Sequence, residues 1–289
     1  MQRRHLGLGI LSLVLAHRAF ASTPPGPPLH VAKRGRARVY LFGFGEARDE
    51  SWMTPPIRDA FESSSDLWLE VSQEPSPVPD AARQREQLAH DAQGRSFFDV
   101  LDPALRVRAS DYCAQLGIAP ETIAPQRPWS AFYTLNGAYW SRHKPSFEPR
   151  NPDETLLKMA KSAGKPVHYE MPDQLEFARF MAAMPDAAQS QYIQFLLDFL
   201  DDRAAGRGAG EFDWIAGDTT GGERAVDRMR TRTPDLYQVM QVRRNAWWAD
   251  TIERLLAAGD VHFIGIGQMH VLGPDGIVSQ LRRRGVAVG

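Results

Sequence analysis

Apolar positions along the chain follow the strand period in some segments and the helix period in others, in an α/β order. Ala37 to Phe42 (ARVYLF) and Asp66 to Val71 (DLWLEV) are rich in β-branched and aromatic residues, which predicts two buried strands. Between them, Thr54-Pro55-Pro56 supplies an N-cap and a first-turn proline, so a helix to about Ser64 is expected. A β-α-β unit of this kind favours parallel strands joined by a right-handed crossover.

The middle of the chain is predominantly helical, and its C-terminal part returns to the α/β rhythm. Helical periodicity is found over residues 80–92, 96–117, 129–139, 153–163, 173–184, 187–202, 235–258 and 277–284, and short strands are expected over 165–170, 261–265 and 286–288. Residues 203–210 (RAAGRGAG) predict a flexible break. We therefore predict one α/β domain. Its mainly parallel sheet is built from N- and C-terminal parts, with a helical insertion between them.

The first residues are typical of a targeting segment. Arg3 and Arg4 precede a short apolar run, and Ala19-Phe20-Ala21 is an A-x-A cleavage signal, so residues 1–21 are expected to form a signal peptide. The apolar run is too short to span a bilayer comfortably. An exported protein, periplasmic or extracellular and without a transmembrane span after cleavage, is therefore expected. Residues 22–36 begin with STPPGPPLH and predict a Pro-rich linker, with a single α/β domain over residues 37–289.

Composition excludes several classes of protein and several kinds of site. The chain has 34 Lys and Arg against 35 Asp and Glu, with a formal charge of -1, and such a balance argues against a nucleic-acid-binding protein. Cys113 is the one cysteine, so neither an intramolecular disulfide nor a Cys-rich metal site can form, and no local motif activates this thiol. A metal site in this protein would have to use His, Asp and Glu.

Charged side chains follow four of the predicted strands. Ligands bind beyond the carboxyl ends of strands in open α/β sheets, and Glu46, Glu70, Glu170 and His270 lie at such ends. Three carboxylates and an imidazole suit a divalent metal such as Mn²⁺, Zn²⁺ or Fe²⁺, and they equally suit a metal-free acid–base site. Helix capping or ion pairing would explain each residue without a function. Arg243-Arg244 either orients an anionic group or lies on a solvated helix face.

Several motifs make the chain resemble the TraB/PrgY/GumN family. The most specific match is Arg244-Asn245-x-x-Trp248, followed after a helix and a strand by Gly267-Gln268-Met269-His270 and then by Leu272-Gly273-Pro274-Asp275-Gly276. Further matches are Val39 to Gly43, Leu67 to Glu70, Pro128-Trp129, Gly164 to Glu170 with Gln174, and the closing Leu281-Arg282-x-x-Gly285-x-x-Val288. The resemblance covers nearly the whole chain after residue 21.

The resemblance implies a fold and a chemistry. The fold would be that of the erythromycin-esterase and ChaN group, and the family's animal members, the Wnt-cleaving TIKI proteins, are regarded as metal-dependent proteases. By this resemblance Glu46, Glu70 and His270 would bind a metal such as Mn²⁺, Co²⁺ or Zn²⁺. Glu170 would be a further ligand or the catalytic base, and Arg244 would stabilise developing negative charge. The family usually has a G-x-x-H motif after the first strand, and Glu46 stands where its histidine is expected.

Two functions follow from these expectations, and a third possibility is a degenerate family member that kept the fold and lost the chemistry. The first is a metal-dependent, peptidase-like hydrolase at the carboxylate–histidine site. The alternative is a non-catalytic envelope protein that binds a peptide, haem or a polysaccharide precursor, since the GumN name attaches the family to polysaccharide biosynthesis. Five aromatic residues either line such a binding surface or pack in the core: Trp129, Tyr133, Trp140, Trp247 and Trp248.

Overall fold

The computed structural model describes residues 26–143, 151–206 and 213–289. A six-stranded sheet runs in the order β4-β3-β5-β2-β1-β6. Its strands are β1 (Leu29–Arg34), β2 (Ala37–Phe44), β3 (Asp66–Val71), β4 (Val167–Met171), β5 (Val261–Gly267) and β6 (Ala287–Val288). The pairs β2–β5, β3–β5 and β3–β4 are parallel, whereas β1 is antiparallel to β2 and β6. The predicted α/β fold with a sheet from both ends of the chain is confirmed.

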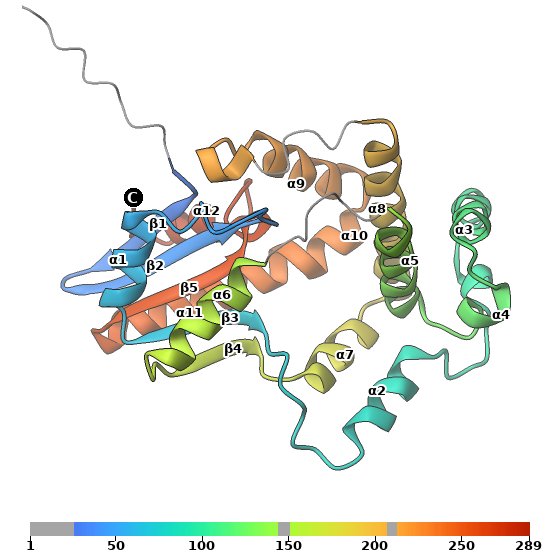
Figure 1. The fold of residues 1–289 in the computed structure, drawn as a ribbon, viewed down its shortest axis with the longest axis horizontal. Helices are drawn as coiled ribbons and strands as arrows, with labels where there is room; N and C mark the ends of the chain where they lie inside the picture. Colours follow the sequence, from blue (N-terminus) through green and yellow to red (C-terminus); the bar gives the residue numbers. More distant parts are fainter. Residues whose placement is uncertain (1–25, 144–150, 207–212) are drawn as a thin grey trace, which may run out of the picture.

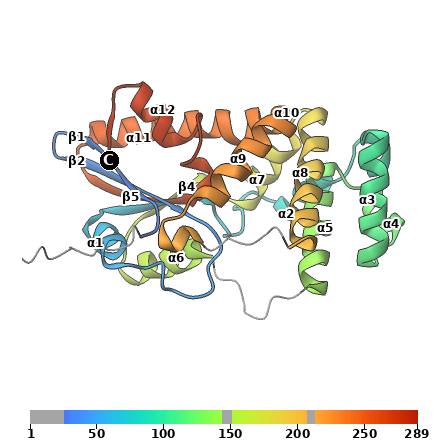
Figure 2. The same cartoon turned by 90° about the horizontal axis from the view of Figure 1, so that it is seen from above.

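Helices cover both faces of the sheet (Figure 2). One face carries α11 (Arg244–Ala258) and α12 (Ile277–Arg283), and the other carries α1 (Pro55–Ser63) and α6 (Pro152–Ser162). The strands alternate in register with this arrangement. Leu67 and Leu69 belong to the apolar core under α1 and α6, while Trp68 packs against the core under α11. Successive side chains of β3 therefore point alternately to the two helical layers, because a strand has a side-chain period of two.

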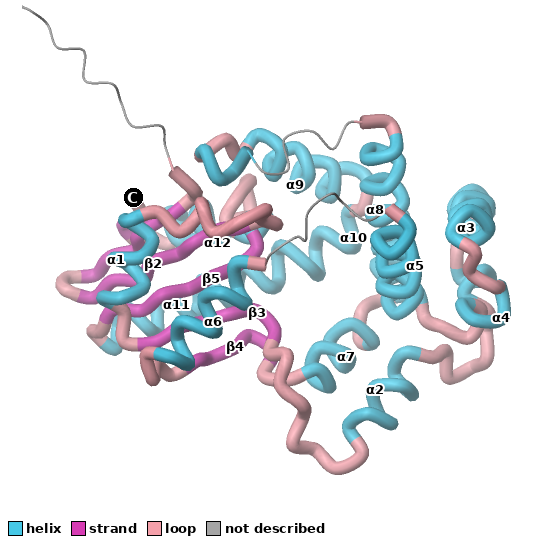
Figure 3. The backbone as a smooth tube through the Cα atoms, in the orientation of Figure 1, coloured by secondary structure: helices cyan, strands magenta, loops and turns pink. Residues whose placement is uncertain are grey.

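The predicted helical insertion lies beyond the carboxyl ends of the strands (Figures 1 and 3). Its elements are α2 (Ala81–Ala89), η1 (Phe97–Val100), α3 (Pro103–Leu116), α4 (Pro120–Ile123), α5 (Pro128–Arg142), α7 (Gln174–Ala182), α8 (Asp186–Ala204), η2 (Asp213–Ala216), α9 (Thr220–Arg232) and α10 (Pro234–Tyr237). Two apolar clusters hold it together, one around α3, α5 and α8 and one around α7 to α10. The insertion thus faces the rim at which the predicted site residues lie.

The long helix expected over residues 235–258 contains an irregularity. After α10, the π-helical turn η3 (Gln238–Arg243) leads without a break into α11. A π turn holds an extra residue, and such turns occur frequently at functional sites. In α11 the buried residues Arg244, Trp248, Ile252 and Leu256 recur at a spacing of four and face the sheet.

The N-terminal boundary of the domain was predicted too late. The expected linker over residues 22–36 includes β1, which pairs along its whole length with β2. The connection is a two-residue turn that begins with Gly35 at φ 60°, a geometry that suits a tight hairpin. The signal peptide expected over residues 1–21 and residues 207–210 of the expected break lie outside the described residues. In the described parts of the chain, no helix is both long and apolar enough to cross a membrane.

Candidate functional site

Strand register brings two of the predicted carboxylates together. Leu69 is paired with Tyr169 and Val71 with Met171, so Glu70 and Glu170 occupy neighbouring positions on β3 and β4. Both side chains alternate with residues of the α1–α6 core and therefore point to the face covered by α11. Like charges at neighbouring positions destabilise a sheet unless a cation lies between them.

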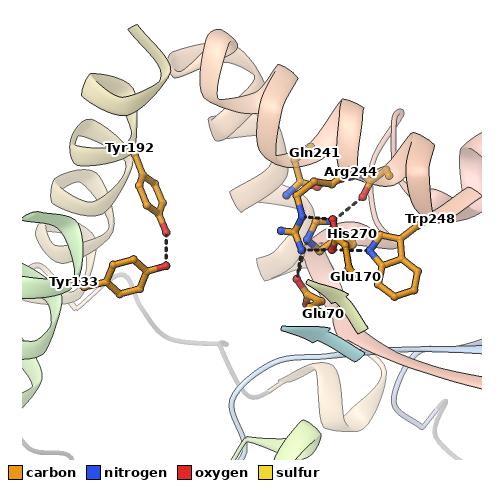
Figure 4. A network of polar contacts seen from close by, with 10 residues as sticks. Glu70, Tyr133, Glu170, Tyr192, Gln241, Arg244, Trp248 and His270 are labelled. Carbon is orange, nitrogen blue, oxygen red and sulfur yellow. Dashed lines mark hydrogen bonds and ion pairs between the residues drawn. The ribbon is translucent and has the colours of Figure 1, made fainter. Parts of the chain in front are cut away.

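The cation is Arg244, at the start of α11 (Figure 4). Its Nε donates to Glu170 Oε1 over 2.8 Å, and its Nη2 donates both to Glu170 Oε2 over 2.5 Å and to Glu70 Oε2 over 2.7 Å. The Trp248 indole adds a hydrogen bond to Glu170 Oε2 over 3.0 Å. Arg244 and Glu170 side chains are only 7% and 8% exposed, whereas Glu70 is 25% exposed. Glu70 is therefore the carboxylate that solvent reaches.

Neighbouring charges in this cluster shift the pKa values of Glu70 and Arg244 so that both groups stay charged. Burial by itself would raise the pKa of Glu70. The charges of His270 and Arg244, with hydrogen bonds from His270 and the Gly267 amide, outweigh burial and hold this pKa well below its usual range. Burial would lower the pKa of Arg244, but its bonds to Glu170 and Glu70 raise it further above its usual value. Glu70 and Arg244 are therefore both charged at neutral pH.

His270 joins the cluster through the carboxylate of Glu70. Its Nε2 lies 3.3 Å from Glu70 Oε2, and its Nδ1 lies 2.6 Å from Oδ1 of Asn245. The Asn245 amide nitrogen donates to the Asp275 carbonyl over 2.9 Å, so Oδ1 is the acceptor that faces His270. Nδ1 of His270 must therefore carry a proton and donate it. The remaining Glu70 oxygen, Oε1, accepts the Gly267 amide over 2.7 Å.

Two tyrosines of the helical insertion point toward each other at some distance from this cluster (Figure 4). The hydroxyls of Tyr133 on α5 and Tyr192 on α8 lie 3.4 Å apart. Burial raises the pKa of both phenols, and the charge of Arg244 only partly offsets it. Both tyrosines are therefore neutral hydroxyls at physiological pH. Tyr133 is 44% exposed, whereas Tyr192 is buried beneath Phe132.

The structure does not bring Glu46 into this cluster. β2, which precedes Glu46, is separated from β3 by β5, whereas β4 and β5 both flank β3 directly. Glu46 is exposed, and its backbone carbonyl accepts a hydrogen bond from Trp214 over 3.1 Å. The contacts among Glu70, Glu170, Arg244 and His270 in the described chain do not include its carboxylate. Four of the five predicted site residues therefore meet at one place, without Glu46.

The cluster as arranged does not fit a metal ion. All four oxygens of Glu70 and Glu170 accept N–H donors, and the guanidinium of Arg244 lies where a cation would bind. Both ring nitrogens of His270 also have partners. Within residues 26–143, 151–206 and 213–289, no three His, Cys, Asp or Glu side chains are arranged to hold a metal. The metal implied by the family motifs would require Arg244 to move away from the carboxylates.

Sequence reasoning missed the supporting roles of Asn245 and Trp248. Trp248, expected either on a binding surface or in the core, is fully buried, and its indole nitrogen donates to Glu170. A signal was present, because Arg244 and Trp248 are separated by four residues and therefore lie on one helix face. Of the other aromatic candidates, Trp129 is buried, whereas Tyr133 and Trp247 are exposed. The supporting residues thus come from the same helix as Arg244.

Comparisons with known proteins agree with the motifs. The family model described as TraB/PrgY/gumN matches residues 28–289, which starts at the residue before β1 and runs to the end of the chain. Comparisons with curated proteins and with solved structures gave no match. A family match over nearly the whole chain establishes membership by itself. The chain belongs to the TraB/PrgY/gumN family.

Proposed function

We propose that this protein is a hydrolase that cleaves peptide-like bonds with a water activated by His270 beside Glu70. The observation that carries the proposal is the 3.3 Å approach of His270 Nε2 to Glu70 Oε2, at a strand-end rim and beside a buried arginine. Hydrolases need a base, an anion or cation that stabilises charge, and access for water. Glu70, at 25% exposure, supplies the access.

His270 is the base in this proposal. Asn245 holds the imidazole by accepting the Nδ1 proton, so in the neutral imidazole Nε2 is the unprotonated nitrogen that takes a proton from water. The water oxygen then forms a bond to the substrate carbonyl carbon. The C–N bond breaks as Nε2 returns its proton to the leaving nitrogen. Glu70 stays ionised, because its pKa is held low, and it stabilises the imidazolium formed in between.

Arg244 is positioned to stabilise the oxyanion. Its Nε and Nη2 donate to the two carboxylates, while Nη1 has no acceptor among the described residues. Removal of one such donor typically costs about 100-fold to 1,000-fold in rate. Glu170 keeps this guanidinium in place with two hydrogen bonds. The proposal therefore makes Glu170 the residue that orients Arg244, and it moves the base from Glu170 to His270.

The experiment is a peptide-cleavage screen on the purified protein, first treated with chelator and then supplied with Mn²⁺, Co²⁺ or Zn²⁺. We expect cleavage after chelation, and a loss of about 100-fold or more in His270→Gln, in line with the usual contribution of an acid–base residue. The matched control is Glu46→Gln, an exposed carboxylate outside the cluster, which should cleave like the wild type. Thermal melts of both variants check folding. No cleavage in any condition, or full activity in His270→Gln, would refute the proposal.

A binding protein for an envelope peptide, haem or polysaccharide precursor is the second candidate. The exposed rings of Tyr133 and Trp247 favour it, because each lines a surface cavity and aromatic side chains commonly line ligand pockets. Mass spectrometry of ligand recovered after incubation separates the two candidates. Intact ligand supports binding, and cleaved ligand supports the hydrolase. Export, proposed from the pattern of residues 1–21, is tested by N-terminal sequencing of the secreted or periplasmic protein.

A further inference from the structure

A cavity of about 340 Å³ opens beside the Arg244–Glu170 pair. Its walls come from the end of β4, from α7, and from the junction of η3 and α11. Arg243 and Trp247 are four residues apart on one helix, and Glu176 and Phe180 are four residues apart on the other, so each helix presents one pair to the cavity. We call this cavity the Arg243–Trp247 pocket.

The apolar wall of the pocket has an exposed tryptophan. Trp247 is 37% exposed and packs edge-on against Trp248, with 5.0 Å between ring centroids. Phe180 and Met171 continue the apolar wall. The volume is at the lower end of the range for small-molecule sites, about 300–1,000 Å³. It therefore suits one apolar side chain rather than an extended ligand.

Both carboxylates that line the pocket are already paired with arginines, and one further arginine there is not paired within the described residues. Glu170 is bound to Arg244, and Glu176 is bound to Arg179 over 2.6 Å. Arg243 is exposed and has no hydrogen-bond or ion-pair partner in the described parts of the chain. An arginine at the mouth of an apolar pocket is suited to a ligand that joins an apolar group to a carboxylate, because the planar guanidinium binds carboxylates through two parallel hydrogen bonds.

We propose that the Arg243–Trp247 pocket binds the C-terminal residue of a peptide. The apolar side chain packs against Trp247 and Phe180, and the terminal carboxylate pairs with Arg243. This inference rests on the proposed hydrolase function and names its substrate class, peptides with an apolar residue and a free carboxyl group at the C-terminus. Because Arg244 and Glu170 line the same pocket, the anchored peptide brings a nearby amide to the proposed oxyanion donor.

Binding is measured separately from cleavage. The probes are tripeptides that end in phenylalanine, with N-methylated backbone amides that resist hydrolysis, and with either a free or an amidated C-terminus. Calorimetry on the whole protein should show about tenfold tighter binding of the free acid, which corresponds to about 1.4 kcal/mol and is close to the contribution of one hydrogen bond to a charged group. Arg243→Gln should bind both forms equally, and Trp247→Ala should weaken both alike. Arg36→Gln, an exposed arginine in the β1–β2 turn, is the matched control and should keep the preference.

Equal affinity of the wild type for acid and amide would overturn the inference, and so would a preference that survives in Arg243→Gln. Both test positions are on the surface, so the variants are expected to fold. A protein that shows the carboxylate preference and cleaves no peptide keeps the pocket and refutes the hydrolase. A protein that cleaves peptides without the preference keeps the hydrolase and refutes the pocket.

Discussion

Oε2 of Glu70 lies 2.7 Å from Nη2 of Arg244, and the same oxygen lies 3.3 Å from Nε2 of His270. One carboxylate oxygen thus links a buried guanidinium on α11 to an imidazole that follows β5. The guanidinium and the imidazole come from residues 26 positions apart in the chain, and they meet at β3. A change at any of these three residues should therefore alter both stability and the proposed chemistry.

Replacement of Arg244 should destabilise the fold strongly. Arg244→Leu leaves the neighbouring carboxylates of Glu70 and Glu170 without their shared cation, and loss of one partner from a buried ion pair costs about 3–5 kcal/mol. Urea unfolding measures the free energy. The double variant Arg244→Leu with Glu170→Gln removes one of the two orphaned charges and should recover part of the loss. A single variant as stable as the wild type would contradict the buried cluster.

The stability of the protein should decrease in acid through Glu70. The pKa of this carboxyl is lowered in the folded protein, so its stabilising contribution is fully present above the unfolded value of about 4.3 and is lost as the pH falls toward the folded value. Urea unfolding between about pH 7 and pH 3 should show a smaller decrease in Glu70→Gln than in the wild type. Equal pH slopes in the two proteins would contradict this account.

Restoration of the family histidine should not create a metal site. In Glu46→His the new imidazole is carried at the end of β2, with β5 between that strand and β3. The oxygens of Glu70 and Glu170 remain bound to Arg244, Trp248 and Gly267. Elemental analysis and Zn²⁺ titration of wild type and Glu46→His should therefore agree. Zinc bound by the variant alone, at one equivalent, would show that the carboxylates exchange Arg244 for a metal.

Hydrophobic periodicity predicted most of this fold, because strands with a buried face and amphipathic helices carry their burial in the sequence. Hydrophobic periodicity did not predict β1. Its residues follow a Pro-rich stretch and have little alternation, and the informative signal was Gly35 at the first position of a two-residue turn. The pattern did not predict α9 for another reason. This helix has Gly221-Gly222 in its first turn and is dominated by charged residues, and of its apolar residues only Val226 and Met229 are buried.

The site was predicted in part because charged residues at strand ends are visible in the sequence, whereas the order of the strands is not. Glu70 and Glu170 meet because β3 and β4 are neighbours in register, and His270 joins them because β5 flanks β3 on the other side. Glu46 follows an equally good strand, but that strand lies one position further along the sheet. The function of Arg244 as the bridge between carboxylates depends on the rotation of α11, which the π-helical turn before it affects.

The single thiol should be unreactive in the folded protein. Cys113 is 3% exposed among apolar residues of α3, α5 and α8, and burial raises the pKa of its thiol to about 11. The thiolate is the reactive form, so little of it exists near neutral pH, and the reagent cannot approach it. A colorimetric thiol reagent at about pH 8 should label the unfolded chain fully and the folded protein at a rate limited by opening of the helical insertion. Labelling of the folded protein as fast as the unfolded chain would show that this apolar cluster does not shield the thiol.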